Sequence, residues 1–174
     1  MRAEVTAYWA GEDRLFALSF GDILDIEEAC GKLGFGEIYL RLGRHQYKAE
    51  FILNILRIGL IGGGMKSDEA RRLVESRLIG VGFARAVEVC IDLLATAMEG
   101  VEQDDTKPAG DPAQPLDVGA ILASFAKLGV SPESVKALSL AEFISMCRAF
   151  GGDGFKAPSE AEFEEMLEKF GADG

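Results

Sequence analysis

The segment Gly62-Gly-Gly-Met-Lys-Ser67 comes closest to a known chemical motif, because glycines followed by Lys-Ser occur in the phosphate loops of nucleotide-binding proteins. A phosphate loop needs its last glycine directly before the lysine and a β-strand leading into the loop. Here Met65 separates Gly64 from Lys66, and the preceding residues have the pattern of a helix. The spacing therefore predicts a helix-ending turn, where consecutive glycines reach left-handed conformations and let another backbone approach closely.

A second candidate site is a calcium loop near the C-terminus. Asp153, Gly154 and Glu160 match positions five, six and twelve of an EF-hand loop. Positions one and three are Ala149 and Gly151, which offer no side-chain oxygen. A cation would therefore lack the ligands that replace its hydration shell. We predict a glycine turn and no metal site in this segment.

No other group of side chains has the composition of a catalytic centre. His45 is the single histidine, so neither a His/Cys zinc cluster nor a hydrolase relay through a second histidine is available. Carboxylates at helical spacing, such as Asp25 with Glu28, are typical of solvated helix faces. We expect a protein that is not an enzyme and that needs no cofactor.

The net charge limits the classes of partner that the protein can bind, and the cysteines indicate its cellular compartment. Eighteen basic and twenty-nine acidic residues give a net charge of −11, which repels nucleic-acid phosphates and anionic membranes. No apolar run reaches the roughly 18 residues that cross a bilayer, and no basic segment precedes an apolar stretch at the N-terminus. We expect a cytoplasmic protein without nucleic-acid or membrane partners. Its cysteines, Cys30, Cys90 and Cys147, are expected to be buried free thiols.

The first hundred residues predict a β-hairpin followed by helices. Two β-prone runs, Val5–Trp9 and Leu15–Phe20, flank the polar turn Gly11–Asp13. The first helix is expected to start with Asp22 as its N-cap, and a later helix with Ser67 as its N-cap. The helical segments that the apolar spacing predicts are 22–30, 37–42, 51–58, 67–78 and 83–98.

Three of these helices carry specific expectations. The segment 51–58 is apolar nearly all round, which predicts a helix buried at the centre of the domain. In the first helix, Asp25, Glu27 and Glu28 are expected on the solvent side. The segment 83–98 has the most regular amphipathic pattern and is expected to hold the domain together. Its predicted apolar face consists of Phe83, Val87, Cys90, Ile91, Leu94, Ala95 and Met98.

The composition changes after this domain. Residues 102–115 carry three prolines and acidic charge without an apolar period, which predicts a linker. Short helices are expected to start at Asp117, at Ser131-Pro132 and at Ser139. Ser139 and Glu142 have the spacing of a capping box.

The predicted fold is therefore mainly α with a small N-terminal β-hairpin, an α+β class. It has three parts, which are a helical domain (1–100), an acidic, proline-rich linker (101–116) and a small helical module (117–174). The last helix of the module is expected to start at Ser159 and to carry an apolar stripe on one side.

Four segments, taken in order, resemble a known family. They are Gly21-Asp-Ile-Leu-Asp-Ile-Glu-Glu-Ala-Cys-Gly31, Gly36-Glu-Ile-Tyr39, Leu56-Arg-Ile-Gly-Leu-Ile-Gly-Gly-Gly-Met65 and Glu69-Ala-Arg-Arg-Leu-Val-Glu75. Over about the first hundred residues the chain resembles the tail proteins of gene transfer agents and related long-tailed phages. That family carries two labels, tail tube protein and tail assembly chaperone. Tube subunits polymerise through extended β-sheets, so one hairpin among about eight helices favours the chaperone label.

The resemblance implies a protein that binds the tape-measure protein of the tail and recruits tail tube subunits. The alternative is a structural subunit of the tail tube. A chaperone of this kind would cover the amphipathic helices of the tape-measure chain with apolar helix faces before they aggregate. Residues 116–150 also loosely resemble the small helical module of tail chaperones. Whether the chain forms a homo-oligomer is left open.

The candidate partner-binding residues lie at the glycine turn and on the last helix. At the turn they are Ile58, Leu60, Ile61, Gly62, Gly63, Gly64 and Met65. On the last helix they are Phe163, Met166 and Phe170. The alternative for the apolar members of both groups is plain packing in the core.

Overall fold

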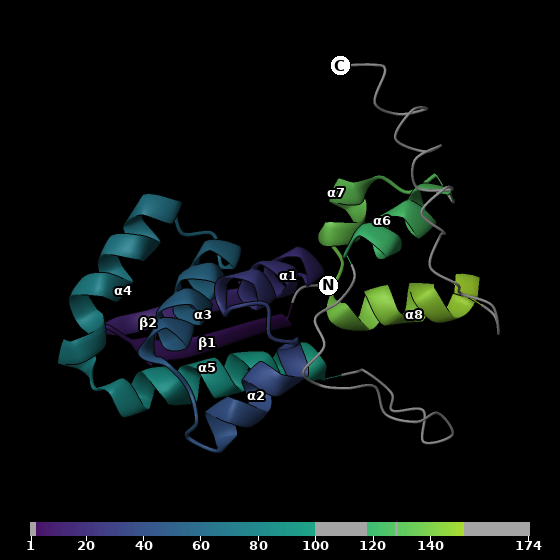
Figure 1. Cartoon of the computed structure of the whole chain (residues 1–174). Helices are drawn as coiled ribbons and strands as arrows, with labels where there is room; N and C mark the ends of the chain where they lie inside the picture. Colours follow the sequence, from purple (N-terminus) through teal and green to yellow (C-terminus); the bar gives the residue numbers. More distant parts are fainter. Residues whose placement is uncertain (1–2, 100–117, 128, 152–174) are drawn as a thin grey trace.

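The chain folds as a β-hairpin covered by helices, followed by a smaller group of three helices (Figure 1). The computed structural model describes residues 3–99, 118–127 and 129–151. The first part contains β1 (Ala3–Trp9), β2 (Glu12–Leu18), α1 (Phe20–Ala29), α2 (Phe35–Gly43), α3 (Ala49–Gly62), α4 (Ser67–Val81) and α5 (Phe83–Met98). The second part contains α6 (Val118–Lys127), α7 (Pro132–Lys136) and α8 (Leu140–Gly151). The predicted α+β class is confirmed, whereas the predicted linker and last helix lie outside the described residues.

The two strands pair antiparallel through a turn of only two residues. Trp9 pairs with Glu12, and the residues between them, Ala10 and Gly11, have φ angles of 55° and 98°. Two consecutive positive φ angles match the right-handed twist of the paired strands, which favours this short turn. The predicted turn Gly11–Asp13 is therefore wrong, because its last two residues belong to β2, and both strands begin earlier than expected.

Two helix starts differ from their predicted caps. The N-cap of α1 is Ser19, whose hydroxyl accepts a hydrogen bond from the Asp22 N–H at 3.3 Å. Asp22 Oδ2 accepts one in return from the Ser19 N–H at 2.7 Å, so Asp22 closes a capping box instead of serving as the N-cap. The N-cap of α4 is Lys66, and no side chain caps this helix. Its predicted cap, Ser67, is the first helical residue, because the chain enters α4 through an extended Lys66 directly after the glycine turn.

The predicted solvent position of Glu27 is also wrong. Its side chain is buried, and Oε1 accepts a hydrogen bond from the Phe35 N–H at 2.7 Å. Phe35 is the first residue of α2, and the first N–H groups of a helix have no partner within it. The positive end of α2 therefore offsets the lost hydration of the carboxylate. Asp25 and Glu28 are exposed, as predicted.

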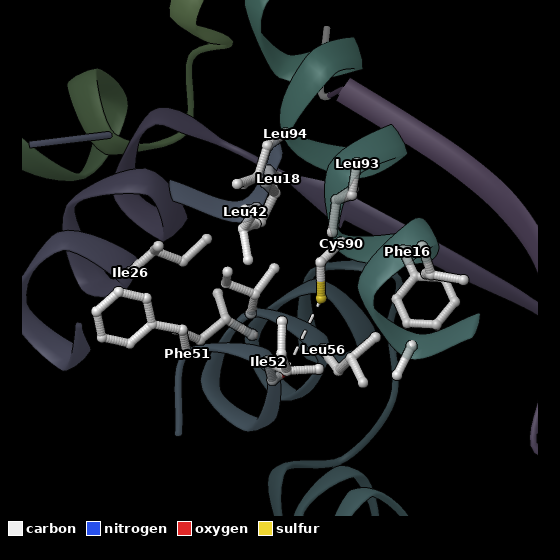
Figure 2. Packing of buried hydrophobic residues seen from close by; sticks show 14 of the residues in the cluster. Phe16, Leu18, Ile26, Leu42, Phe51, Ile52, Leu56, Cys90, Leu93 and Leu94 are labelled. Carbon is white, nitrogen blue, oxygen red and sulfur yellow. Dashed lines mark hydrogen bonds between the residues drawn. The ribbon is translucent and has the colours of Figure 1, made fainter. Parts of the chain in front are cut away.

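Helices α3 and α5 form the centre of the main core, the larger of two hydrophobic clusters. α3 packs on β2, and α5 packs on β1. Figure 2 shows Ile52 and Leu56 of α3 next to Cys90 of α5, whose Sγ donates to the Ile52 carbonyl oxygen at 3.9 Å. Ile55 and Phe51 of the same helix are also buried. The prediction of a central buried helix over 51–58 is confirmed.

The buried face of α5 differs in part from the predicted one. Val87, Cys90 and Leu94 are buried as expected. Phe83 and Met98, at the two ends of the helix, are each 37 % exposed, because the helix extends past the core on both sides. The other buried positions of the helix are Ala86, Val89, Leu93 and Ala97.

The three helices of the second part are here called the C-terminal module (Figure 1). Its helix α7 packs on α1, and its helix α8 packs on α5. Ser131 caps α7, and the Ser139–Glu142 capping box starts α8, both as predicted. The predicted cap Asp117 lies outside the described residues. A second hydrophobic cluster consists of Phe20 and Leu24 of α1 with Phe125, Val135 and Phe143 of the module.

The three cysteines are free thiols that differ in their burial. Cys30 and Cys90 are buried free thiols, as predicted, whereas Cys147 is only partly buried. Burial, with a smaller effect of the Glu50 carboxylate, raises the pKa of Cys30 to about 12, and burial also raises the pKa of Cys90. In the part of the chain that the structure describes, no helix is long and apolar enough to cross a membrane.

Candidate protein-interaction site

The glycine turn after α3 lies directly against strand β2. A side chain at Gly62 would collide with the carbonyl oxygen of Ala17, and one at Gly63 with the carbonyl oxygen of Leu15. Gly64 has a φ angle of 100°, which favours glycine. A helix, not a strand, leads into this turn, so the geometry differs from that of a phosphate loop. The turn ends α3 and permits the close backbone approach that the sequence predicts.

The predicted contact residues around this turn fall into two groups. Leu60 is 1 % exposed, and Ile58 is 7 % exposed, so both belong to the main core. Ile61 and Met65 are partly buried and pack against the same core. The structure thus gives these four side chains a packing role and leaves parts of Ile61 and Met65 accessible.

A groove of about 310 Å³ between α1 and α3 brings two of the predicted residues next to charged groups. Ile58 and Ile61 line it from α3, together with Arg57. The α1 side is formed by Asp22, Asp25, Glu28 and Ala29. The α1–α3 groove therefore combines an apolar wall with carboxylates and one guanidinium group.

The fold changes the titration of Asp25 in this groove. Partial burial raises its pKa above the ordinary value, and the neighbouring Asp22 carboxylate adds to this effect. Lys136 of the C-terminal module and Arg57 act in the opposite direction. Asp25 thus lies where charges from α1, α3 and α7 meet, and a further cation in the groove would favour its ionised form.

Arg57 is placed between two grooves by a chain of hydrogen bonds. Asn54 Nδ2 donates to the Ala29 carbonyl oxygen at 3.0 Å, and Arg57 Nη2 donates to Asn54 Oδ1 at 3.5 Å. No described carboxylate lies within ion-pair distance of Arg57. On the other side of α3, Arg57 also lines a groove of about 300 Å³ against α4. Arg57 therefore lines both grooves with a guanidinium group that can bind a partner carboxylate.

Two exposed apolar residues on the hairpin were not singled out from the sequence. Tyr8 is 61 % exposed, and Leu15 is 42 % exposed. Leu15 pairs with Thr6 in the sheet, so Tyr8 and Leu15 are diagonal neighbours on the outer face. Successive side chains of a strand point to opposite faces, so the inward positions of Trp9 and Phe16 imply that Tyr8 and Leu15 lie on the outer face.

The remaining predicted positions can be located only in part. Phe163, Met166 and Phe170 lie outside the described residues. Ala149 and Gly151, the first and third positions of the rejected calcium loop, belong to α8. Within 3–99, 118–127 and 129–151, no group of three or more His, Cys, Asp or Glu side chains is arranged to hold a metal ion.

The arrangement at α1 and α3 suits reversible binding of a protein segment. An apolar side chain fits against Ile58 and Ile61, a basic group against the α1 carboxylates, and a carboxylate against Arg57. A family model described as phage tail tube protein, GTA-gp10, matches residues 2–100, which include the hairpin and α1–α5. No curated protein and no solved structure matches the chain.

Proposed function

The chain belongs to the phage tail tube protein, GTA-gp10 family, and we propose that it is a tail assembly chaperone. In this role it binds the tape-measure protein in the host cytoplasm and recruits tail tube subunits to it. The observation that carries the proposal is the small amount of strand in the region that the family model matches. The described residues 3–99 contain five helices and two strands of seven residues each.

The environment of β2 adds to this argument. Subunits of a β-sheet tube need extended strands with edges that can pair between subunits. The carbonyl oxygens of Leu15 and Ala17 in β2 lie against Gly63 and Gly62, so α3 already occupies this side of the strand. A two-stranded sheet in which the protein's own helix covers one strand edge suits a binding protein better than a tube wall.

The proposed mechanism is reversible holding without covalent chemistry. An amphipathic helix of the tape-measure protein places an apolar side chain against Ile58 and Ile61 in the α1–α3 groove. Its basic residues face Asp25 and Glu28, and an acidic residue pairs with Arg57. The helix is thereby kept from aggregating until tube subunits replace the chaperone.

Co-expression with a tape-measure protein from the same tail tests the proposal. We expect a soluble complex with the wild-type protein. Replacement Ile61→Asp should reduce the recovered complex, because it puts a charge on the apolar wall of the groove. The exposed position Phe83, on the far end of α5, provides the control Phe83→Asp, which should retain the complex. A tape-measure protein that is equally soluble without this chain would contradict the chaperone role.

A structural tail tube subunit is the second candidate, because the description of the matched family itself names a tail tube protein. Mass spectrometry of purified particles separates the two functions. A chaperone leaves before the particle is complete and should be absent from it. A tube subunit should be among the most abundant proteins of the particle.

A further inference from the structure

Helix α1 has a second buried face, which points away from the main core. Ile23 and Ile26 pack in the main core, whereas Phe20 and Leu24 belong to the second cluster. We call Phe20 and Leu24 the outer face of α1. The Phe20 ring stacks on Phe143 of α8, with centroids 3.8 Å apart and planes 10° apart.

Backbone and charge contacts join the C-terminal module to the same side of α1. The Phe20 N–H donates to the Leu138 carbonyl oxygen at 2.6 Å. A Cβ atom at Gly21 would lie only 3.0 Å from Lys136 Cβ, so α7 approaches the α1 backbone closely at this glycine. The charge of Lys136 also opposes the rise in the pKa of Asp25, so the two groups interact favourably.

The segment that covers the outer face of α1 is separate from the family domain. The family match ends at residue 100, and α6–α8 span 118–151. Five side chains form the buried part of the second cluster, and two of them, Phe20 and Leu24, come from α1. Units below roughly 40 residues usually need an additional support to fold. Release of the module from α1 should therefore also unfold it.

We infer that the outer face of α1 is a second protein-docking site, which the C-terminal module covers and an amphipathic partner helix can occupy instead. The module shows which chemistry fits. Leu140 and Phe143, three positions apart on α8, supply an aliphatic and an aromatic side chain, and Lys136 supplies a positive charge beside Asp25. The partner helix carries the same three groups, with its aromatic ring in the place of Phe143.

The module belongs to the same chain as α1, which explains why the site is closed in the free protein. Covalent connection holds a module near its site at an effective concentration of about millimolar. A partner at micromolar concentration therefore binds only after the module has been weakened or displaced. The apparent affinity of the site falls in proportion to the fraction of molecules in which it is open.

A labelled peptide of residues 131–151 is the probe, and the full-length protein is the receptor. Phe143→Ala in the protein weakens the cover and leaves α1 unchanged, so it should bind the peptide roughly tenfold more tightly than the wild type does. Adding Gly21→Leu should abolish this gain, because a side chain at Gly21 blocks the approach of α7. A peptide that itself carries Phe143→Ala should not bind, and Phe83→Ala in the protein should match the wild type.

Hydrogen exchange of the same proteins separates opening from unfolding. In Phe143→Ala, the Phe20 amide should exchange roughly tenfold faster, while the amides of α3 keep their protection. Val135→Ala, which also lies in the module, should have the same effects and provides an independent variant. The proposal is overturned if neither variant gains peptide binding, or if the gain survives Gly21→Leu. Dimerisation of the wild type that Phe143→Ala abolishes would assign the face to a second copy instead of a partner.

This test uses neither the tape-measure protein nor tube subunits. Its outcome is therefore independent of the chaperone role proposed above. If the chain proves to be a structural tail subunit, a positive result still defines a docking site on α1. A negative result leaves the proposed role of the α1–α3 groove unaffected.

Discussion

The main core and the second cluster use helix α1 in different ways. The buried residues of the main core come from both strands and from α1–α5, and Leu140 of α8 packs against them. The second cluster joins α1 to a module that follows residues 100–117. The buried side chains of the first region come from seven elements, whereas Phe20 and Leu24 pack against one small module. We therefore expect the first region to unfold cooperatively and the second cluster to open locally.

The largest effect is expected from a cavity in the main core. Leu56 is fully buried between α3 and α5, and Leu56→Ala should lower the free energy of unfolding by about 2–5 kcal/mol. Urea unfolding monitored by circular dichroism measures this loss. Leu53→Ala is the matched control on the same helix, because Leu53 is only partly buried and should cost clearly less. Equal losses would show that α3 is not the centre of the first region.

The next effect concerns the contact between the glycine turn and β2. Gly62→Ala places a methyl group against the Ala17 carbonyl oxygen, and overpacking of this kind costs about 1–3 kcal/mol. The same urea titration gives the value. Gly43→Ala, at the end of α2, meets nothing within 4 Å and should be neutral or slightly stabilising. A neutral Gly62→Ala would remove the argument that α3 blocks β2.

A smaller and local effect is expected in the second cluster. Val135→Ala removes two methyl groups from a fully buried position, at a cost of about 1.6 kcal/mol. The loss should promote opening of the module and leave the urea midpoint of the main core unchanged. Maleimide labelling at pH 8 with mass spectrometry reports the opening, because Cys147 packs on this cluster and should react faster. Faster labelling of Cys30 or Cys90 as well would mean that the two regions unfold together.

The smallest effect is expected at Asp25, on the helix that the two regions share. Partial burial and, to a lesser extent, the Asp22 carboxylate raise the pKa of Asp25 in the folded state, so the ionised form is less favourable there than in the unfolded chain. The raised pKa stabilises the folded state relative to the unfolded chain at pH values below the pKa that Asp25 has in the unfolded chain. This stabilisation is lost as the pH rises through the pKa of Asp25 in the folded state. Asp25→Asn should therefore be slightly more stable than the wild type at pH 7 and equal to it at pH 3. Thermal unfolding at both pH values measures the difference, and a variant that is less stable at pH 7 would reverse the sign.

Much of the candidate site could be predicted from local sequence. The failed phosphate-loop spacing at Met65 indicates a helix-ending turn, and Gly62 to Gly64 form one. The groove could not be predicted in the same way. Arg57 and Asp25 face it from two helices that are separated by α2, and their proximity depends on how α3 packs on the hairpin. Ile58 and Ile61 could be chosen from the sequence, but not their charged neighbours.

The sequence by itself determined the order of the elements, the central position of α3, the glycine turn and the capping box of α8. These features depend on residues within a few positions of one another, where helical spacing and capping hydrogen bonds act. Only the tertiary structure decided that Glu27 is buried at the N-terminus of α2 and that Phe20 faces Phe143 instead of the main core. Helix α1 carries apolar residues on two faces, and its sequence does not specify what covers each one. That choice depends on contacts between segments far apart in the chain, where the burial of matching surfaces outweighs any local preference.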